Sequence, residues 1–188
     1  MRIVLIAGSL REGSYNRALI KVIGEVLAMK RSPEIIVELA DIAPIPFYNG
    51  DVEAKGLPEE VVKLRERIRS SHGVIIATPE YNYSVPGVLK NTIDWVSRPP
   101  DQPFLRKPVG IVGASTGRFG TVRAQSHLRY ILGGLGARVM PTPELMVTSA
   151  GEKFDTRGHL SDAATREQLE KFGDAFLIWV EGFLTYEH

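Results

Sequence analysis

The sequence contains no cysteine, and this absence removes several classes of function at once. Without thiols the chain can form neither disulfide bonds nor thiolate metal sites, and it has no cysteine nucleophile. Its four histidines, at positions 72, 127, 159 and 188, are scattered with no spacing typical of a metal site. We therefore expect no bound metal and no thiol chemistry.

Long apolar runs and an excess of one charge are also missing. No stretch approaches the roughly 18 apolar residues that a membrane-spanning helix needs. The 23 basic and 22 acidic residues are spread fairly evenly and give a formal net charge of +1, without the dense basic stripe of a nucleic-acid surface. The sequence starts at once with a strand-like pattern, and no signal or transit peptide is visible. We expect a cytoplasmic protein that binds neither membranes nor nucleic acid.

The 188 residues, 44% of them hydrophobic and 24% charged, match one globular domain spanning 1–188. Apolar segments predict strands at 2–8, 35–40, 73–78, 109–113 and 138–140, the last continuing through 145–147 after a proline interruption. Apolar residues at helical spacing predict helices around 18–27, 61–68, 89–96, 128–135 and 169–183. A proline-rich loop is expected over 42–56.

Five strands alternating with five helices predict an α/β fold in which helices cover both faces of a parallel sheet. For a chain of this size we expect a flavodoxin-like three-layer α/β/α architecture with a five-stranded sheet in the order 2-1-3-4-5. The strand order then reverses between the first and third strands. A ligand should accordingly contact the loops that follow the first, third and fourth strands.

The first of these loops, Gly8–Asn16, has the composition of a phosphate site. Ser and Asn side chains offer neutral hydrogen-bond donors, Arg11 offers a charged guanidinium group, and the N-terminus of the next helix offers backbone N–H groups. A polar turn that merely caps the helix is the alternative explanation. The absence of cysteine excludes the low-molecular-weight tyrosine phosphatases, which place a phosphate loop at the same point but attack with a thiolate.

The other two loops are suited to a flat aromatic ring. Pro79–Gly87 concentrates two tyrosines, an asparagine, a serine and two prolines, and these residue types suit an isoalloxazine ring with polar edges. Gly113–Gly120 is rich in glycine, so its backbone N–H groups can approach the negative charge that develops near N1 and the C2 carbonyl of a reduced flavin. Taken singly, a proline-stiffened turn and a flexible glycine turn would explain them as well.

The chain resembles a known family at these loops. Gly8–Asn16 and Pro79–Gly87, followed by Lys90-Asn91 and Asp94-Trp95, are similar to the NADPH-dependent FMN reductase family, closest to its bacterial chromate and quinone reductase branch. The resemblance covers about residues 2–150. The string Pro-Glu-Tyr-Asn-x-Ser-x-Pro-Gly is specific, whereas Gly-Ser-Leu-Arg is less so. Residues 151–158 match no motif that we can name.

The resemblance implies the residues of an FMN site. Ser9, Arg11, Ser14 and Asn16 would hold the phosphate, and Leu10, Glu12, Gly13 and Tyr15 would add backbone and contacts. Pro79, Glu80, Tyr81, Asn82 and Tyr83 would line the isoalloxazine ring, with Ser115 touching it from the third loop. Family members form homodimers and homotetramers, so the resemblance implies one of these assemblies.

The activity implied is that of an FMN-dependent NAD(P)H oxidoreductase. Hydride would pass from NADPH or NADH through FMN to small-molecule acceptors (quinones, chromate, azo compounds or free flavin) in a ping-pong cycle. This chemistry needs no general base, so we assign no catalytic side chain. A flavodoxin-type electron carrier is the main alternative, although such carriers are strongly acidic and this chain is nearly neutral. A binding protein that has lost flavin is a third. The physiological acceptor, the preferred nicotinamide, the oligomer number and the role of 151–158 stay open.

Overall fold

The structure is a computed structural model that describes residues 1–30 and 35–184. Its strands are β1 (Arg2–Ala7), β2 (Ile36–Ala40), β3 (Gly73–Ala77), β4 (Pro108–Ala114), β5 (Arg138–Val139) and β6 (Leu145–Val147). Its helices are α1 (Tyr15–Lys30), α2 (Gly50–Glu53), α3 (Glu59–Ser70), α4 (Gly87–Val96), α5 (Val122–Gly134), α6 (Ala150–Lys153) and α7 (Ala163–Leu184).

All strands are parallel and lie in the order β2-β1-β3-β4-β5, with β6 also paired to β4. The predicted strand order 2-1-3-4-5 and the flavodoxin-like fold class are therefore confirmed. The predicted fifth strand is two short strands along one edge of β4, since Pro108 pairs with Arg138 and Val112 pairs with Leu145. Pro141 and Pro143 lie between the two strands, and a proline has no N–H to continue the ladder.

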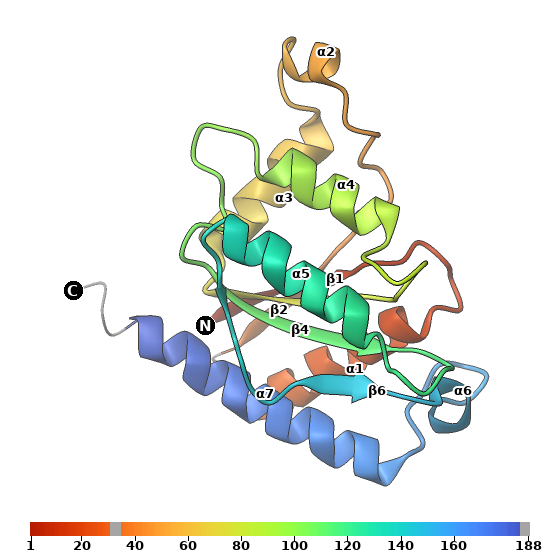
Figure 1. The fold of residues 1–188 in the computed structure, drawn as a ribbon. Coiled ribbons are helices and arrows are strands. Elements are labelled where there is room, and N and C mark those ends of the chain that lie inside the picture. The colour runs from red at the N-terminus through yellow and green to blue at the C-terminus, as the bar shows by residue number, and fades with distance from the viewer. Residues whose placement is uncertain (31–34, 185–188) are drawn as a thin grey trace.

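Helices cover both faces of the sheet (Figure 1). Below it in that view lie α1 and α7, and above it lie α3, α4 and α5. Side chains alternate between the two layers along each strand, because successive residues of a strand point to opposite faces. In β1, Ile3 and Leu5 pack against α1 and α7, whereas Val4 and Ile6 pack against the helices of the other face. The central strands β3 and β4 are buried along their whole length, as their unbroken apolar sequences predict.

The structure contains two short helices that the sequence does not predict. The expected loop at 42–56 contains α2, which projects from the body of the molecule (Figure 1) and has no buried residue. Its first turn is capped by Asn49, whose side chain accepts a hydrogen bond from the Asp51 N–H at 2.8 Å. Because no apolar stripe is buried, hydrophobic spacing cannot reveal such a helix. The other, α6, follows β6 in the segment that matched no motif.

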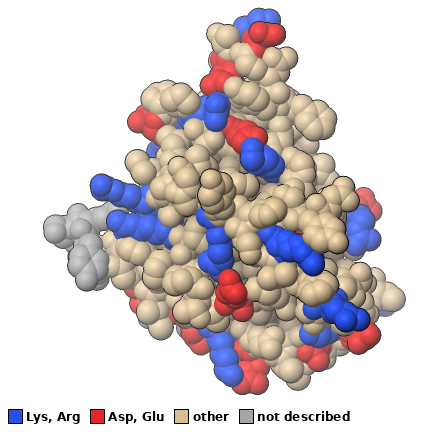
Figure 2. All heavy atoms as spheres, viewed as in Figure 1, with Lys and Arg blue, Asp and Glu red and all other residues tan. Residues whose placement is uncertain are grey.

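Membrane spans and metal clusters are not found in the described part of the chain, and the face drawn in Figure 2 has no basic stripe. Among these residues no helix combines the length and the apolar character that crossing a membrane requires. Within residues 1–30 and 35–184, no group of three or more His, Asp or Glu side chains is arranged to hold a metal ion. Figure 2 shows Lys and Arg interspersed with Asp and Glu, so the described residues form no continuous stripe of one charge on the face in view.

Candidate functional site

Three loops meet at the carboxyl edge of the sheet, on the right in Figure 1. They follow β1, β3 and β4, which are neighbours in the sheet. Backbone hydrogen bonds join the strand ends where the loops begin, from Gly8 N–H to the Ala77 carbonyl at 2.8 Å and from Thr78 N–H to the Val112 carbonyl at 2.9 Å. The loops thus leave adjacent strands at the point where the strand order reverses, which is where ligands bind in open α/β sheets.

The first loop is folded around two buried serines. Ser9 and Ser14 are 4% and 6% exposed. The Arg11 N–H donates to Ser9 Oγ at 3.3 Å, and the Ser14 N–H donates to the Arg11 carbonyl at 3.2 Å, so the loop closes into a turn in front of α1. The hydroxyl of Ser14 makes no hydrogen bond with any described residue. This loop therefore presents an unused hydroxyl on a buried residue, beside the positive end of α1.

Arg11 and the start of α1 supply further donors. Arg11 is exposed, and its guanidinium lies next to Gly13. The N–H groups of Tyr15, Asn16 and Arg17, in the first helical turn, have no intrahelical acceptor, as at every helix N-terminus. Neutral, charged and backbone donors are thus available around one small turn, and this donor set fits a phosphate group.

The side chain of Asn16, which the sequence suggested as a phosphate ligand, has partners within the protein. Its side chain is 3% exposed and pairs with the backbone of Ala114 at the end of β4. Asn16 Nδ2 donates to the Ala114 carbonyl at 2.8 Å, and the Ala114 N–H donates to Asn16 Oδ1 at 2.9 Å. The carboxamide is directed at the protein and joins the first loop to the third.

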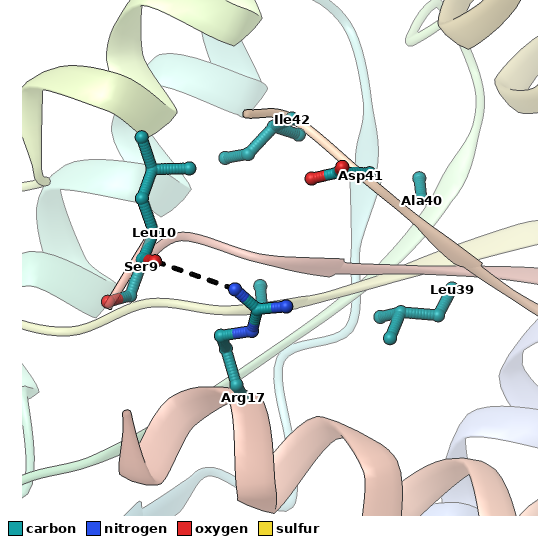
Figure 3. A pocket seen from close by; sticks show the side chains of 8 residues that line it. Ser9, Leu10, Arg17, Leu39, Ala40, Asp41 and Ile42 are labelled. Atoms are coloured by element: carbon teal, nitrogen blue, oxygen red, sulfur yellow. Dashed lines mark hydrogen bonds between the residues drawn. The ribbon is translucent and has the colours of Figure 1, made fainter. Parts of the chain in front are cut away.

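Arg17 is a cation of this region that the sequence analysis did not select. Figure 3 shows its guanidinium extending from α1 towards Ser9 and Leu10, with Asp41 and Ile42 on the far side. These residues line a cavity of about 180 Å³ between the first loop and the end of β2. Arg17 Nη1 lies 3.5 Å from the Leu10 carbonyl, at the long limit for a hydrogen bond. Arg17 sits on the first turn of α1, and helical periodicity alone does not say that it points towards the loop.

The second loop contains a tight two-residue turn. Tyr81 and Ser84 exchange backbone hydrogen bonds of 3.1 and 3.0 Å. Between them Asn82 and Tyr83 both have positive φ, 47° and 65°, as a type I′ turn requires. A left-handed conformation costs roughly 1–2 kcal/mol for a residue such as Tyr83. The rings of Tyr81 and Tyr83 are 51% and 68% exposed, so the turn presents two aromatic side chains at the sheet edge.

Glu80 fastens this loop to α5. Its carboxylate accepts hydrogen bonds from the backbone N–H groups of Arg123 and Ala124, at 2.9 and 3.2 Å, and pairs with Arg123 Nη1 at 3.0 Å. Thr121, the residue before α5, makes no side-chain cap of its own, so Glu80 caps the helix in its place. Burial raises the pKa of Glu80, but the hydrogen bonds from Arg123 and Ala124 outweigh it and lower the pKa below its ordinary value of 4.5.

Arg123 lies between two aromatic rings. Its guanidinium carbon is 4.5 Å from the ring centre of Tyr83 and 4.6 Å from that of Phe119. Both distances are typical of cation–π contacts. A second link between the same elements joins Ser84 Oγ to His127 Nδ1 at 3.0 Å. The second loop, the third loop and α5 are therefore connected through Glu80 and Arg123.

The third loop is held close to its neighbours. The Ser115 N–H donates to the Val147 carbonyl at 3.0 Å, and its hydroxyl donates to the Gly117 carbonyl at 3.2 Å. At Gly113 a Cβ atom would overlap Thr121 Oγ1 and would lie 2.7 Å from the Thr78 carbonyl oxygen. Only glycine fits there, so the glycine-rich sequence serves close packing between β4 and the second loop.

The structure thus brings the residues selected from the three loops to one edge of the sheet, and it pairs two of their side chains with other parts of the protein. Ser9, Arg11 and Ser14 gather around the first turn, and Tyr81, Tyr83 and Ser115 lie on the neighbouring loops. The Asn16 and Glu80 side chains have protein partners instead. Sequence reasoning missed Arg17 and the anchoring role of Arg123, since each depends on contacts between distant elements.

Comparisons with known proteins identify the family of this chain. A family model described as NADPH-dependent FMN reductase matches residues 1–152. An NAD(P)H-dependent FMN reductase of Pseudomonas aeruginosa is 50% identical over 180 residues, covering 96% of this chain and 95% of that protein. A quinone reductase of Escherichia coli is 43% identical over 180 residues, covering 93% and 94%. The solved structure of FerB, a flavoenzyme NAD(P)H:(acceptor) oxidoreductase from Paracoccus denitrificans, has a TM-score of 0.85 at 37% identity, covering 96% and 97%.

Proposed function

This chain belongs to the NADPH-dependent FMN reductase family and is an FMN-dependent NAD(P)H oxidoreductase, and from this premise we propose how its residues hold FMN and which electron acceptors it serves. The observation that carries the proposal is the meeting of three interconnected loops at the point where the strand order reverses. Within the proposal, residues 1–188 form one FMN-binding domain.

The first loop is proposed to hold the phosphate. Ser9, Arg11 and Ser14 would donate to its oxygens, and the first turn of α1 would add backbone N–H groups. The hydroxyl of Ser14 supports this assignment, because it has no hydrogen-bond partner among the described residues and is available to a ligand. Asn16 is proposed to contribute through its backbone N–H, since its side chain is committed to Ala114.

The second and third loops are proposed to line the ring. The full set of proposed FMN contacts is Ser9, Leu10, Arg11, Glu12, Gly13, Ser14, Tyr15, Asn16, Pro79, Glu80, Tyr81, Asn82, Tyr83 and Ser115. Glu80 would contribute through its backbone, because its carboxylate faces Arg123 and Ala124. Support comes from the strained turn at Asn82 and Tyr83, since backbone strain of this kind is concentrated at functional sites.

FMN, when bound, would supply the hydride chemistry of a ping-pong cycle between NAD(P)H and an acceptor. The protein would bind and orient the partners, and we propose no catalytic acid or base among its side chains. Quinones, chromate, azo compounds and free flavin are the proposed acceptors. The family and the names of its relatives favour this reductase over an electron carrier of the flavodoxin type, which would oxidise no nicotinamide.

The protein is further proposed to act in the cytoplasm as a homodimer or homotetramer. The exposure of large hydrophobic side chains in a single chain supports the assembly. Among them, Phe47, Tyr130 and Ile178 are 86%, 85% and 69% exposed. Light scattering on the purified protein would test it. A mass equal to that of one chain at micromolar concentration would contradict the assembly.

Anaerobic spectroscopy tests the proposed reaction. The purified protein should show the visible absorbance of an oxidised flavin, which NADPH or NADH should bleach in the absence of oxygen. Adding a quinone, chromate, an azo dye or free FMN should then restore the colour and identify the acceptors used. A flavin that stays oxidised with both nicotinamides would support the electron carrier instead. A protein that stays colourless with excess FMN would contradict the cofactor site.

A further inference from the structure

A second cavity lies beside the first loop and is larger than the one at Arg17. Its volume is about 550 Å³, within the range of small-molecule sites. It is lined by residues 12–15 of the first loop, by Arg17, Ala18 and Lys21 of α1, and by residues 155–158. In Figure 1 the segment that follows α6 lies beside the start of α1. The cavity therefore adjoins the proposed phosphate turn and reaches the part of the sequence that matched no motif.

Residues 154–160 form a hairpin with its own internal hydrogen bonds. Phe154 and Leu160 pair as an isolated antiparallel bridge, and the Asp155 N–H donates to the His159 carbonyl at 2.9 Å. The Asp155 carboxylate accepts the N–H groups of Arg157 and His159 at 2.9 and 2.8 Å. These hydrogen bonds lower the pKa of Asp155, so the hairpin itself stabilises the ionised carboxylate. The hairpin is thus a built element that carries Arg157 at its tip.

The hairpin is fixed against α1. The Phe154 ring centre lies 5.8 Å from that of Tyr15, and Gly158 faces Ala18, whose Cβ would be 3.6 Å from a Cβ on the glycine. This packing places Arg157 in the lining of the cavity together with the first turns of α1. A fixed wall of this kind can position a charge for a ligand.

Positive charge predominates in the cavity. Arg17, Lys21 and Arg157 line it together with two carboxylates, Glu12 and Asp155, and Asp155 is already engaged by the hairpin. Many other cations of the described chain have a carboxylate partner: Lys63 with Glu59, Arg67 with Glu38, Arg69 with Glu66, Lys90 with Asp94, Arg123 with Glu80, Arg129 with Glu144 and Lys171 with Glu167. Neither Lys21 nor Arg157 has one among the described residues. An anionic ligand would complement this cavity.

The FMN phosphate does not need these cations, because the first loop has Ser9, Arg11, Ser14 and the N-terminus of α1 for that group. We infer that the cavity binds the 2′-phosphate of NADPH, with Lys21 and Arg157 as the residues that select NADPH over NADH. The inference rests on the proposed function. The cavity lies at the edge of the sheet where the three loops meet, beside the phosphate turn, and could take the adenosine half of a dinucleotide whose nicotinamide is at the ring. The 2′-phosphate is the group by which NADPH differs from NADH.

Calorimetry with the FMN-loaded protein tests the inference. The variants are Lys21→Gln, Arg157→Gln and the double substitution, titrated with NADP⁺, NAD⁺ and 2′,5′-ADP. Because exposed charge pairs are weak individually, each single variant should weaken NADP⁺ and 2′,5′-ADP by about threefold, and the double variant by about tenfold. NAD⁺ affinity and FMN affinity should stay within about twofold of the unsubstituted protein. Arg106→Gln, an exposed arginine at the opposite edge of the sheet, is the matched control and should change none of them.

Two results would overturn the inference. One is an unchanged NADP⁺ affinity in the double variant. The other is an equal loss of FMN affinity, which would assign the cations to the FMN phosphate instead. A failure of the proposed function is distinguishable, because it would leave the unsubstituted protein without flavin absorbance whatever the outcome with 2′,5′-ADP.

Discussion

The side chain of Asn16 and the backbone of Ala114, 98 positions apart in the sequence, exchange a pair of buried hydrogen bonds of 2.8 and 2.9 Å. One partner begins α1 and the other ends β4, so the pair sets the first loop against the third. From the sequence, an asparagine at the start of this helix suggests contact with a ligand. In the structure its carboxamide uses one N–H and one lone pair on Ala114, which leaves one N–H and one lone pair. The side chain of Asn16 therefore joins the first loop to the third.

Asn16→Ala should therefore reduce stability more than it reduces contact with a ligand. The substitution leaves the Ala114 N–H and carbonyl buried without partners, and we expect the free energy of unfolding to fall by about 2–4 kcal/mol. Urea titration of the flavin-free protein measures this loss. Ser14→Ala is the matched control, because its hydroxyl has no partner among the described residues, and it should weaken FMN while leaving the apoprotein's unfolding nearly unchanged. The reverse pattern would make Asn16 a direct phosphate ligand.

Arg11→Ala should weaken FMN binding at least tenfold, since a charge-assisted hydrogen bond contributes about 1.5–3 kcal/mol. Riboflavin has the same ring and no phosphate, so its affinity should change far less. Fluorescence titration of the apoprotein with both flavins makes the comparison within one variant. Equal losses for FMN and riboflavin would show that Arg11 acts on the loop's shape and not on the phosphate.

Glu80→Gln should destabilise the protein by about 1–2 kcal/mol at pH 7, because it removes the charge from a helix cap and an ion pair. The folded-state pKa of Glu80 lies below 4.5, so the ionised carboxylate stabilises the fold above that pH, and this contribution disappears as the pH falls through the folded value. The difference between the variant and the unsubstituted protein should accordingly shrink between neutral pH and about pH 3.

Urea titrations at several pH values measure that difference. Glu59→Gln, which removes an exposed partner of Lys63, is the control and should have a much smaller effect at every pH. A Glu80→Gln difference that does not vary with pH would mean that the charge of Glu80 contributes nothing to the link with α5.

Gly113→Ala should lower stability by about 1–3 kcal/mol and weaken FMN, because the new methyl group must displace Thr121 or the Thr78 carbonyl and so move the third loop. Gly133→Ala provides the comparison. Gly133 lies within α5, and no neighbouring atom comes within 4 Å of the position that an alanine methyl group would take, so alanine should stabilise the helix by about 0.5–1 kcal/mol. Thermal unfolding of both variants checks the pair, and similar Tm values for the two would contradict the close packing at Gly113.

Local pattern was sufficient for the scaffold. Unbroken apolar runs located β1, β3 and β4, and helical spacing located α1, α3, α4, α5 and α7. Burial of one face of an element requires apolar residues at a regular spacing, and that spacing is visible in the sequence. The pattern failed at α2 and α6. Within the described chain α2 buries no side chain, and α6 buries only Ala150, so neither carries an apolar stripe.

The sequence by itself determined which loops form the candidate site, since the alternation of strands and helices sets the strand order and the strand order sets the edge at which those loops meet. Only the tertiary structure decided what their side chains do there. Asn16 pairs with Ala114, Glu80 pairs with Arg123, and Arg157 and Lys21 line the same cavity. The physical reason is that helices, strands and their buried faces depend on the pattern of residues close together in the sequence. The partner of a polar side chain, in contrast, belongs to an element that is distant in the sequence.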